Sequence, residues 1–390
     1  MNQPNELHLD LMSISGFNPW IQHDSSGRLH MVSSHLGQML VIDGATERKC
    51  QTGFEREYGK YTFNVKMPVD GQIVEIIDRY KPTLGEDSIN ENPQIIVIYE
   101  DINTKELGII SLVRYCTNHQ YFGFQYVNKN GLNQLHVGAM IPKDTVFLDS
   151  PNVTDDSNYK YGIELNIALM THPASSEDSI LISDDVLPKL RFKTYEHRVV
   201  EWGNKKFALN LYGDENNYKP FPDIGDFVRK DGILMALRSF DPDILSPVEQ
   251  SIRDTMLVDV IFDSTTYVAG PGGRVVDIKI YHDLSKTNYA DMHMDKQALK
   301  YDLARRQFYS NIVSVWRKFY RERGDALQIT PEFQRLIVEA LSVTSEGTGQ
   351  KISKLYRKAP LDDFRVEFVI EYTNTPGKGY KMTCLHGSKI

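Results

Sequence analysis

Residues 165–185, around which the expected fold is organised, read LNIALMTHPASSEDSILISDD. Two apolar runs, 165–170 and 180–182, flank a short loop rich in Pro and Ser, and such runs predict β-strands. The loop carries an adjacent acidic pair, Glu177 and Asp178, just before the second run. Neighbouring residues of a strand point to opposite faces, so one carboxylate at most can face a given site. From the residues alone, a turn or a solvated edge is favoured for this pair over a catalytic or metal-binding role.

The composition is that of an ordinary folded protein with enough chain for two or three modules: 390 residues, 41% of them hydrophobic. No apolar run approaches the length that spans a bilayer, and the polar start MNQPNELHLD does not resemble a signal peptide. Three scattered cysteines (Cys50, Cys116 and Cys384) form neither a CxxC zinc motif nor a disulfide frame, which predicts a reducing, cytoplasmic setting. A net charge of −8 argues against independent, non-specific binding to nucleic acid, although basic residues can still gather at one channel.

Residues 17–38, FNPWIQHDSSGRLHMVSSHLGQ, combine a helix start with several potential ligands. The Asp-Ser-Ser sequence at 24–26 is typical of a helix N-cap or a turn. The potential metal ligands are His23, Asp24, His30 and His35. Their spacing fits no zinc signature, so surface or hydrogen-bonded histidines are favoured. A phosphohydrolase built on the His23-Asp24 dyad is a weaker hypothesis, because it needs further His and Asp residues on several helices.

Several further runs predict a β-rich scaffold in which we recognise no chemistry: 69–77, 94–98, 107–113 and 274–281. A glycine turn at 270–273 precedes the last of them. This turn is not a dinucleotide-binding fingerprint, because the Gly-x-Gly-x-x-Gly spacing is absent.

The period of the pattern changes over residues 296–323, which predict a helix. Its apolar face repeats at gaps of four, three and four residues: Phe308, Ile312, Val315 and Phe319. Eight Lys and Arg residues against two acidic ones make this stretch strongly basic. A solvated face is the favoured interpretation, and a contact with nucleic acid or an acidic partner is the sharper alternative. A second helix is expected to start at Thr330-Pro331.

The last segment carries a second chemical signal. Residues 364–372 alternate as a strand, and a Pro-Gly-Lys-Gly turn then leads into KMTCLHGSKI. Lys381 and Lys389 enclose His386 and Gly387 in this tail. Taken alone, two lysines in a glycine-bearing tail are most simply solvated. The turn is not a P-loop, because the GxxxxGK[ST] spacing is missing.

Several segments together resemble, in chain order, the beta subunit of multisubunit DNA-directed RNA polymerases. The string SEDSILIS is similar to the family's Phe-Glu-Asp-(Ala/Ser)-Ile-Leu-(Ile/Val)-Ser, with Ser176 in place of Phe. The string PWIQHDSSGRLHM is similar to Pro-Phe-(Leu/Ile)-Glu-His-Asp-x-x-x-Arg-x-x-Met, and the tail to Pro-Gly-Asp-Lys-Met-x-x-(Arg)-His-Gly-Asn-Lys-Gly. Further matches cover residues 53–78, the strand expected within 187–202, and 226–234, which resembles a hammerhead strand-turn-strand.

The resemblance implies a β-rich α+β fold, namely a beta-subunit fragment that contributes to a double-psi β-barrel, with hammerhead- and flap-like strands and a helical insertion. Its expected parts are a fork-like, nucleotide-proximal segment (1–80), a β-rich scaffold (81–162), the acidic-loop strands of the catalytic barrel with the hammerhead-like turn (163–240), a flap-like and helical insertion (241–360), and a barrel strand with the two-lysine motif (361–390).

The resemblance also implies roles for single residues. Those in catalytic positions are Glu177, Asp178, Lys381 and Lys389. Those expected to bind nucleotide or RNA are Arg28, Ser34, Gln38 and His386, with Ser34 where the family usually has Asn. Asp178 would help to hold a second Mg²⁺ shared with a partner chain. Ammonium groups beside a phosphoryl centre offset its developing negative charge, and a guanidinium offers forked donors to phosphate.

The implied function is that of a split beta-like subunit, as in giant bacteriophages, in a DNA-dependent RNA polymerase. The family's Asn-Ala-Asp-Phe-Asp-Gly-Asp motif, which holds the catalytic Mg²⁺ on the beta-prime subunit, is absent from this sequence, so the chain is expected to act only within a complex. Expected partners are other beta-like fragments, beta-prime-like subunits, DNA template, RNA and nucleoside triphosphates, with no membrane. The expected location is the host cytoplasm or the virion. The competing hypothesis is a structural or virion protein that retains the fold without the activity.

Overall fold

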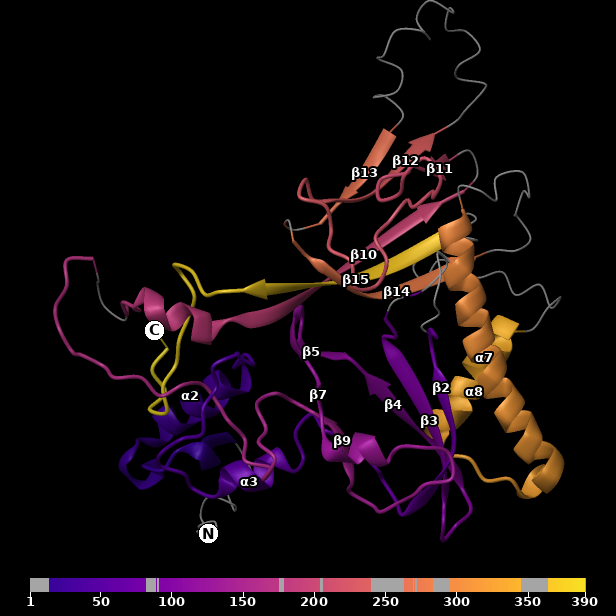
Figure 1. Ribbon diagram of the computed structural model, residues 1–390. Coiled ribbons are helices and arrows are strands. Elements are labelled where there is room, and N and C mark those ends of the chain that lie inside the picture. The colour runs from indigo at the N-terminus through magenta and orange to yellow at the C-terminus, as the bar shows by residue number, and fades with distance from the viewer. Residues whose placement is uncertain are drawn as a thin grey trace, which may run out of the picture.

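The protein is β-rich with a few helices in the computed structural model (Figure 1). The structure describes residues 14–81, 89, 91–174, 179–203, 206–239, 263–268, 270, 272–282, 295–344 and 364–389. Within these ranges the strands form four sheets, and the largest is curled like half of a barrel. The predicted β-rich α+β class is confirmed at this level, whereas the double-psi barrel and the five-part division stay predictions.

A five-stranded antiparallel sheet joins distant parts of the chain in the order β14-β15-β10-β6-β5. Its strands are β14 (Arg274–His282), β15 (Phe364–Asn374), β10 (Phe192–Trp202), β6 (Phe122–Gln125) and β5 (Tyr115–His119). β10 and β15 pair over their whole length, and the ribbon they form ends beside the N-terminal helices (Figure 1). The register therefore delivers the tail that follows β15 to that end of the molecule.

Alternation explains why β15 is central. Val366, Phe368 and Ile370 are fully buried in the main core, and they share it with Trp202 and Tyr301. Residues of the opposite phase face the other side of the sheet, where Glu371 accepts hydrogen bonds from surrounding side chains. Burial of about three large apolar side chains on one strand contributes several kcal/mol, which outweighs the weak intrinsic preference of any single residue.

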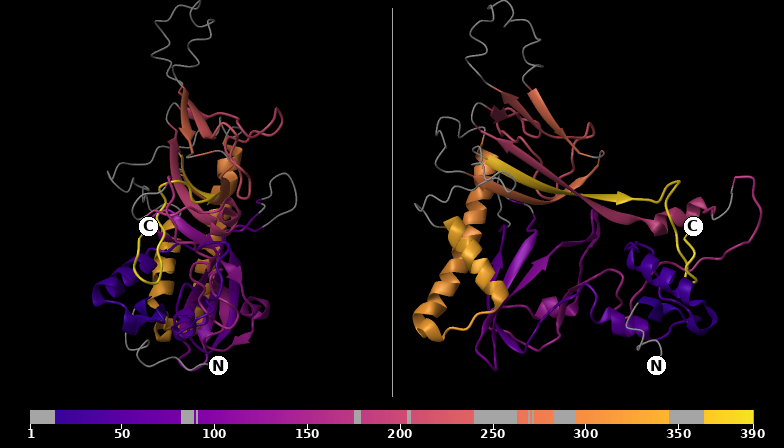
Figure 2. Two further views of the ribbon diagram at one scale, coloured as in Figure 1. Left: turned by 90° about the vertical axis from the view of Figure 1, so that its left-hand side faces the viewer. Right: turned by 180° about the vertical axis from the view of Figure 1, so that it is seen from behind.

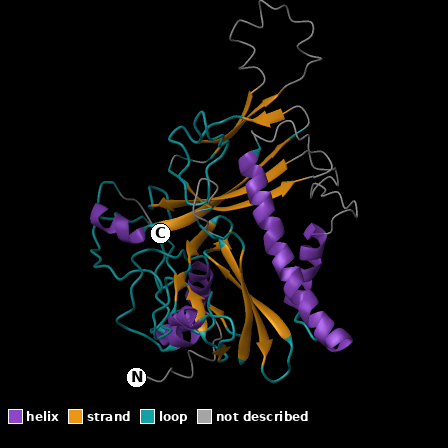
Figure 3. Ribbon diagram, turned by 45° about the vertical axis from the view of Figure 1, so that its right-hand side comes forward, coloured by secondary structure: helices purple, strands orange, loops and turns teal. Residues whose placement is uncertain are grey.

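A second sheet, in the order β4-β3-β2-β8, carries the helical hairpin. Its strands are β2 (Gly71–Asp78), β3 (Gln94–Asp101), β4 (Leu107–Val113) and β8 (Met140–Ile141), and the helices are α7 (Lys296–Arg323) and α8 (Pro331–Thr344). The two helices lie side by side against this sheet (Figure 3). Phe308 and Ile312 of α7 share an apolar core with Ile96 and Ile98 of β3.

Two three-stranded sheets and several short helices complete the described chain. One sheet holds β1 (Val65–Lys66), β9 (Val146–Asp149) and β7 (Val127–Asn128); the other holds β11 (Lys206–Ala208), β12 (Ile233–Ser239) and β13 (Asp263–Tyr267). The short helices are α2 (Ser26–Gly37), α3 (Phe54–Gly59), η1 (Ile14–Phe17), η2 (Ile21–His23), η3 (Asn130–Gln134), η4 (Asp184–Leu190) and η7 (Gly324–Ala326).

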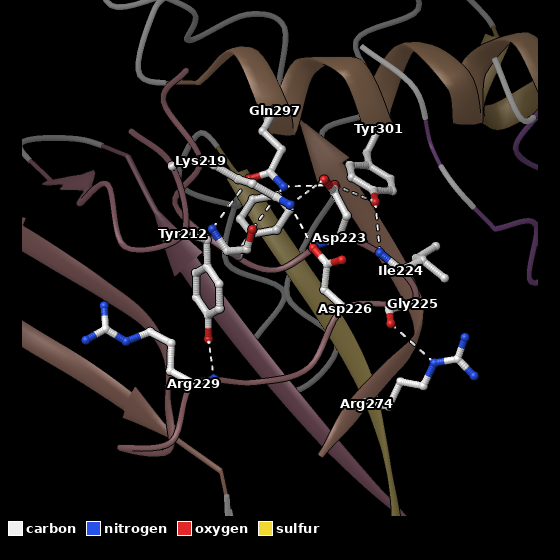
Figure 4. Close-up of polar contacts among 12 residues, drawn as sticks. Tyr212, Lys219, Asp223, Ile224, Gly225, Asp226, Arg229, Arg274, Gln297 and Tyr301 are labelled. Carbon is white, nitrogen blue, oxygen red and sulfur yellow. Dashed lines mark hydrogen bonds and ion pairs between the residues drawn. The ribbon is translucent and has the colours of Figure 1, made fainter. Parts of the chain in front are cut away.

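A buried polar cluster anchors the first two turns of α7 (Figure 4). The Asp223 carboxylate accepts hydrogen bonds from Gln297 (2.9 Å) and Tyr301 (2.9 Å), both on α7. Lys219 pairs with Asp223 at 2.9 Å and with Asp226 at 2.7 Å. Burial works against the charged form, yet the Lys219 ammonium and these donors hold the pKa of Asp223 below its usual value. We interpret this cluster as the connection between α7 and the loop at 217–226.

Most of the strands and helices expected from periodicity are confirmed. Those over 69–77, 94–98, 107–113, 274–281 and 364–372 correspond to β2, β3, β4, β14 and β15, and the helix over 296–323 coincides with α7. α8 begins at Pro331, and the Phe333 amide donates to the Thr330 hydroxyl at 3.4 Å. These segments bury one face against the rest of the protein, so their periodicity reports directly on packing.

The strands predicted at 165–170 and 180–182 are wrong, because both stretches lie outside any strand. A strand exists where a neighbouring strand takes up its backbone hydrogen bonds, and the described part of the chain pairs with neither run. Similarly, the strand expected within 187–202 begins only at Phe192, since η4 contains Pro188 and occupies the residues before it. Of the hammerhead-like strand-turn-strand, Phe227 makes a single bridge to Arg274, and a regular strand starts at Ile233.

Candidate functional site: the helix–tail junction

α2 supplies one half of the candidate site. Ser25 caps the helix by accepting a hydrogen bond from the Arg28 amide at 3.4 Å, as the predicted N-cap requires. Val32 and Leu36 are buried in a small apolar cluster that also contains Leu385 from the other end of the chain. This cluster holds one side of α2 in place and leaves the side chain of Arg28 exposed.

The tail supplies the other half by folding into a tight turn. Thr383 and Lys389 form an isolated antiparallel bridge, and the Thr383 hydroxyl donates to the Ser388 carbonyl at 2.8 Å. Gly387 closes the turn with its amide on the Cys384 carbonyl at 3.2 Å, and its φ of +74° lies in the left-handed region that favours glycine. The backbone of Lys389 is therefore held beside Thr383.

Polar contacts join the two halves into what we call the helix–tail junction, residues 18–35 with 383–389. The Arg28 guanidinium donates to the Gly387 carbonyl at 3.4 Å across 359 residues of sequence. The Asn18 amide donates to the Leu385 carbonyl at 3.1 Å. The Thr383 hydroxyl lies 3.3 Å from Nδ1 of His35. Figures 1 and 2 show the tail running along α2 in each view.

Asp24 organises the exposed side of the junction. One of its carboxylate oxygens accepts a hydrogen bond from the Asn18 amide at 2.5 Å, and the other lies 3.3 Å from Nδ1 of His386. The indole of Trp20 lies against the His386 ring, with 5.6 Å between the ring centroids. Because Asp24 is occupied in this way, it acts as a positioning carboxylate for the tail.

Close packing leaves little freedom where the halves meet. A Cβ added at Gly387 would lie 2.6 Å from the Arg28 carbonyl oxygen and 3.1 Å from Cβ of Met31. Leu385 is only 5% exposed and is buried with Phe17 and Tyr161, whose rings stack at 4.4 Å. The tail is thus seated by apolar burial and a glycine contact as well as by hydrogen bonds.

The structure brings several predicted site residues together. Arg28 and His386 both take part in the junction, and Lys389 belongs to the tail turn, two residues beyond Gly387. Lys381 precedes the turn by two residues and is exposed, as is Lys389. Ser34 and Gln38 are exposed on or just after α2. The junction therefore displays two exposed cationic side chains, Arg28 and Lys389, and exposed Lys381 lies two residues before it in sequence.

The acidic pair Glu177 and Asp178 lies outside the described residues. The stretches on either side, 165–174 and 179–182, form what we call the apolar arm. Both ends of the arm are tied to the loop that follows α2. Just before the arm, the Glu164 carboxylate accepts a hydrogen bond from the Lys49 amide at 2.9 Å. After the arm, the Lys189 carbonyl in η4 accepts one from the Gly44 amide at 2.8 Å. The arm thus leaves and re-enters the fold close to the junction.

The arm exposes its apolar side chains. Ile167, Leu169 and Met170 are 83%, 98% and 70% exposed, and Leu181 is 58% exposed. Single exposed apolar residues are ordinary, but a continuous exposed run is typical of a surface that another molecule covers.

Within the described ranges, no group of three or more His, Cys, Asp or Glu side chains is placed to hold a metal ion. His23, Asp24, His30 and His35 accordingly do not form a metal centre, and His35 and Asp24 contact the tail instead. In the same ranges, no helix has both the length and the apolar character needed to cross a membrane.

Sequence reasoning did not predict Asn18, Trp20 or Asp24 as residues that position the tail. The available signal was their place in the segment PWIQHDSSGR and just before it, which also contains Arg28. Their partners lie more than 350 residues away, so no periodicity could pair them.

Comparison with known proteins gives one distant similarity. The chain is 25% identical over 184 residues to the DNA-directed RNA polymerase subunit beta of Thermosipho melanesiensis. The match covers 47% of this chain and 15% of that protein. No family model matches the chain. The chain is thus a distant, partial relative of an RNA polymerase beta subunit, which supports a polymerase-related function in general terms.

Proposed function

We propose that this chain is a beta-like fragment of a split, phage-type multisubunit DNA-dependent RNA polymerase, where it binds nucleoside triphosphate phosphates and the RNA 3′ end during RNA synthesis. The observation that carries the proposal is the helix–tail junction. Two of the segments that resemble the family, around Arg28 and around Lys389, are far apart in sequence and in direct contact in the fold.

The charges of the junction suit phosphoryl transfer. Arg28 offers a planar fork of donors to phosphate oxygens, and Lys381 and Lys389 offer compact positive charges. Such groups, held near a phosphoryl centre before reaction, stabilise the negative charge that develops there. In this proposal Asp24 and the turn at Gly387 fix the backbone from which Lys389 projects, and His386, Ser34 and Gln38 border the RNA end.

The acidic pair completes the proposed role. Asp178, with Glu177 beside it, would approach the nucleotide from the apolar arm, whose ends lie next to the junction. The Mg²⁺ on which the reaction depends would be held mainly by a beta-prime-like partner, as the resemblance implies. Activity would then require the assembled complex.

The apolar arm supports assembly with partner chains. Transferring exposed apolar surface out of water is worth roughly 25 cal/mol per Å², so a partner that covers Ile167, Leu169 and Met170 gains several kcal/mol. We propose that other beta-like fragments and the beta-prime-like subunit supply this cover in the host cytoplasm or in the virion.

The test is nucleotide incorporation by a reconstituted complex. The full chain is co-expressed with the polypeptide that carries the Asn-Ala-Asp-Phe-Asp-Gly-Asp motif, and RNA synthesis on a DNA template is measured. Lys389→Ala, Lys381→Ala and Asp178→Ala are each expected to lower incorporation about a hundredfold or more while the complex still assembles. Lys378→Ala, which removes an exposed lysine just upstream of the tail, is the matched control and keeps its activity.

Full activity of the Lys389 variant would reject the role assigned to that residue. A complex that assembles as the wild type does, but incorporates no nucleotide, would instead favour a structural or virion protein that retains the fold without activity.

A further inference from the structure

Some basic side chains of α7 form ion pairs that stabilise the fold, and others do not. Arg305 and Arg306 both pair with the buried Asp302, at 3.1 and 2.6 Å. Arg323 pairs with Glu100 on β3 at 2.6 Å. These three arginines fasten the helix to itself and to the neighbouring sheet, which accounts for their presence.

Arg317, Lys318 and Arg321 are different. All three are exposed, and among the described residues no ion pair engages any of them. Their spacing of three and four residues places the charges side by side on the helix surface, where like charges cost roughly 0.2–0.5 kcal/mol per pair. The negative end of the helix favours cations only in the last turn, which contains Arg321 but neither Arg317 nor Lys318. We call these three residues the α7 cation cluster.

An aromatic pair lies among these cations. Tyr320 is 46% exposed, and its ring lies 5.6 Å from that of Trp316, centroid to centroid. Alternating cations and exposed aromatic rings are the combination that binds single-stranded nucleic acid, because cations follow the phosphates while a ring can stack on an unpaired base.

The cluster is remote from the helix–tail junction. α7 ends at the opposite side of the molecule from α2 and the tail (Figures 1 and 2). The whole chain carries a net charge of −8, so three unpaired cations form a local positive patch on an acidic protein. Such a patch attracts an anionic ligand to this part of the surface.

We propose that the α7 cation cluster, with Tyr320, binds the phosphate backbone of single-stranded nucleic acid. The proposal adds a second nucleic-acid contact to the function above and needs no catalysis, so it can be measured on the full chain alone. Failure of this binding test leaves the incorporation assay to decide the proposed function separately.

The experiment measures the fluorescence anisotropy of a labelled 20-nucleotide oligo(dT) titrated with the full chain at several salt concentrations. The combined variant Arg317→Ala, Lys318→Ala, Arg321→Ala is expected to bind about tenfold more weakly at low salt. Its plot of log affinity against log salt should be shallower by roughly 2, because three phosphate contacts on a single strand each contribute about 0.7.

A matched control removes the same charge elsewhere. The variant Lys143→Ala, Lys206→Ala, Lys230→Ala neutralises three exposed lysines on other elements and keeps wild-type affinity and slope. A second variant, Tyr320→Leu, weakens binding to oligo(dT) and leaves binding to a duplex of equal length unchanged, because stacking needs an unpaired base.

Equal weakening by the control variant would show that bulk charge alone governs binding, and the proposal fails. It also fails if wild-type protein does not bind the oligonucleotide at low salt, or if the α7 variant binds as tightly as the wild type. In the last case the cluster would be available to an acidic protein surface instead.

Discussion

The helix–tail junction and the apolar arm lie close together in the fold, and they differ in how their interactions are completed. In the junction, each half supplies what the other lacks: donors on Arg28 and Asn18 meet tail carbonyls, and Leu385 fills the apolar cluster below. In the arm, apolar side chains such as Leu169 are left in water and the backbone joins no strand. The helix–tail junction therefore satisfies its polar and apolar groups within the chain, whereas the apolar arm has the properties of an interface with another molecule.

We expect the largest change in the free energy of unfolding when the same substitution, Leu to Ala, is made in the junction and in the arm. Leu385→Ala removes a buried side chain and should lower the free energy of unfolding by about 2–5 kcal/mol, through lost burial and a residual cavity. Leu169→Ala removes the same atoms from an almost fully exposed position and should change it by less than about 0.5 kcal/mol. Urea unfolding of both variants measures the difference. Equal losses would show that the arm is packed in solution and does not differ from the junction in burial.

Charges placed in the apolar arm should weaken association with partner chains. Ile167→Asp with Leu169→Asp should leave the unfolding of the isolated chain unchanged and lower co-purification with partner subunits at least tenfold, because a partner would have to bury two charges. Co-expression followed by affinity capture through the partner provides the measurement. The control is the pair Val127→Asp and Val338→Asp, which alters exposed apolar residues outside the arm. Unaltered capture of the arm variant would mean that the arm is no interface.

Alanine substitution of two glycines, Gly387 and Gly377, tests the close packing of the junction. Gly387→Ala introduces a Cβ at 2.6 Å from the Arg28 carbonyl oxygen and forces a side chain into a left-handed φ, so we expect a loss of about 1–3 kcal/mol. Gly377→Ala, where the nearest atom would lie 3.8 Å away, should be neutral. Hydrogen exchange of the amides at 383–389 reports whether the tail has left α2. Unchanged protection in the Gly387 variant would contradict the close contact.

The pH dependence of stability can be tested at Asp149 on β9, which lies in neither the junction nor the arm. Burial raises the pKa of Asp149 to about 6. The folded state then binds this proton more tightly than the unfolded state, so the contribution to stability is present below pH 4 and is lost as the pH rises through 6. Asp149→Asn keeps the acceptor for the Ser150 amide and should stabilise the protein by on the order of 1 kcal/mol at pH 7 and by nothing at pH 4. Thermal unfolding at the two pH values tests this; equal effects at both would show that protonation is not the cause.

The smallest expected effect is at Asp24. Asp24→Asn should cost less than about 1 kcal/mol, since its contact with His386 is open to solvent on the histidine side. The change should nevertheless alter the emission of Trp20, because the His386 ring that lies against the indole loses its partner. A His386→Ala variant shows the emission expected when the ring is absent. If Asp24→Asn leaves the emission as in the wild type, Asp24 does not position the tail.

Sequence patterns performed well wherever one face of an element is buried within the chain. The helix over 296–323 and the strand over 364–372 were predictable because the spacing of Phe308 and Ile312, or of Val366 and Phe368, is the spacing of a buried face. The same rule failed at 165–170. An alternating apolar run is also compatible with a segment that pairs with a strand of another molecule. The pattern alone does not say whether the neighbouring strand belongs to the same chain.

For the site, the sequence supplied the motifs and the resemblance, and with them the candidates Arg28, His386 and Lys389. The structure decided that these candidates share one place, through Asp24, Asn18 and the turn at Gly387. The acidic pair at 177–178 is outside the described residues, so its role stays a prediction.

By itself, then, the sequence determined the local elements and the chemical types of the candidate site, because both follow from neighbouring residues along the chain. The contact of the tail with α2 and the exposure of the arm became known from the three-dimensional structure. Contacts across more than 350 residues depend on the register of β10 with β15, which carries the tail to α2, and no local pattern encodes that distance.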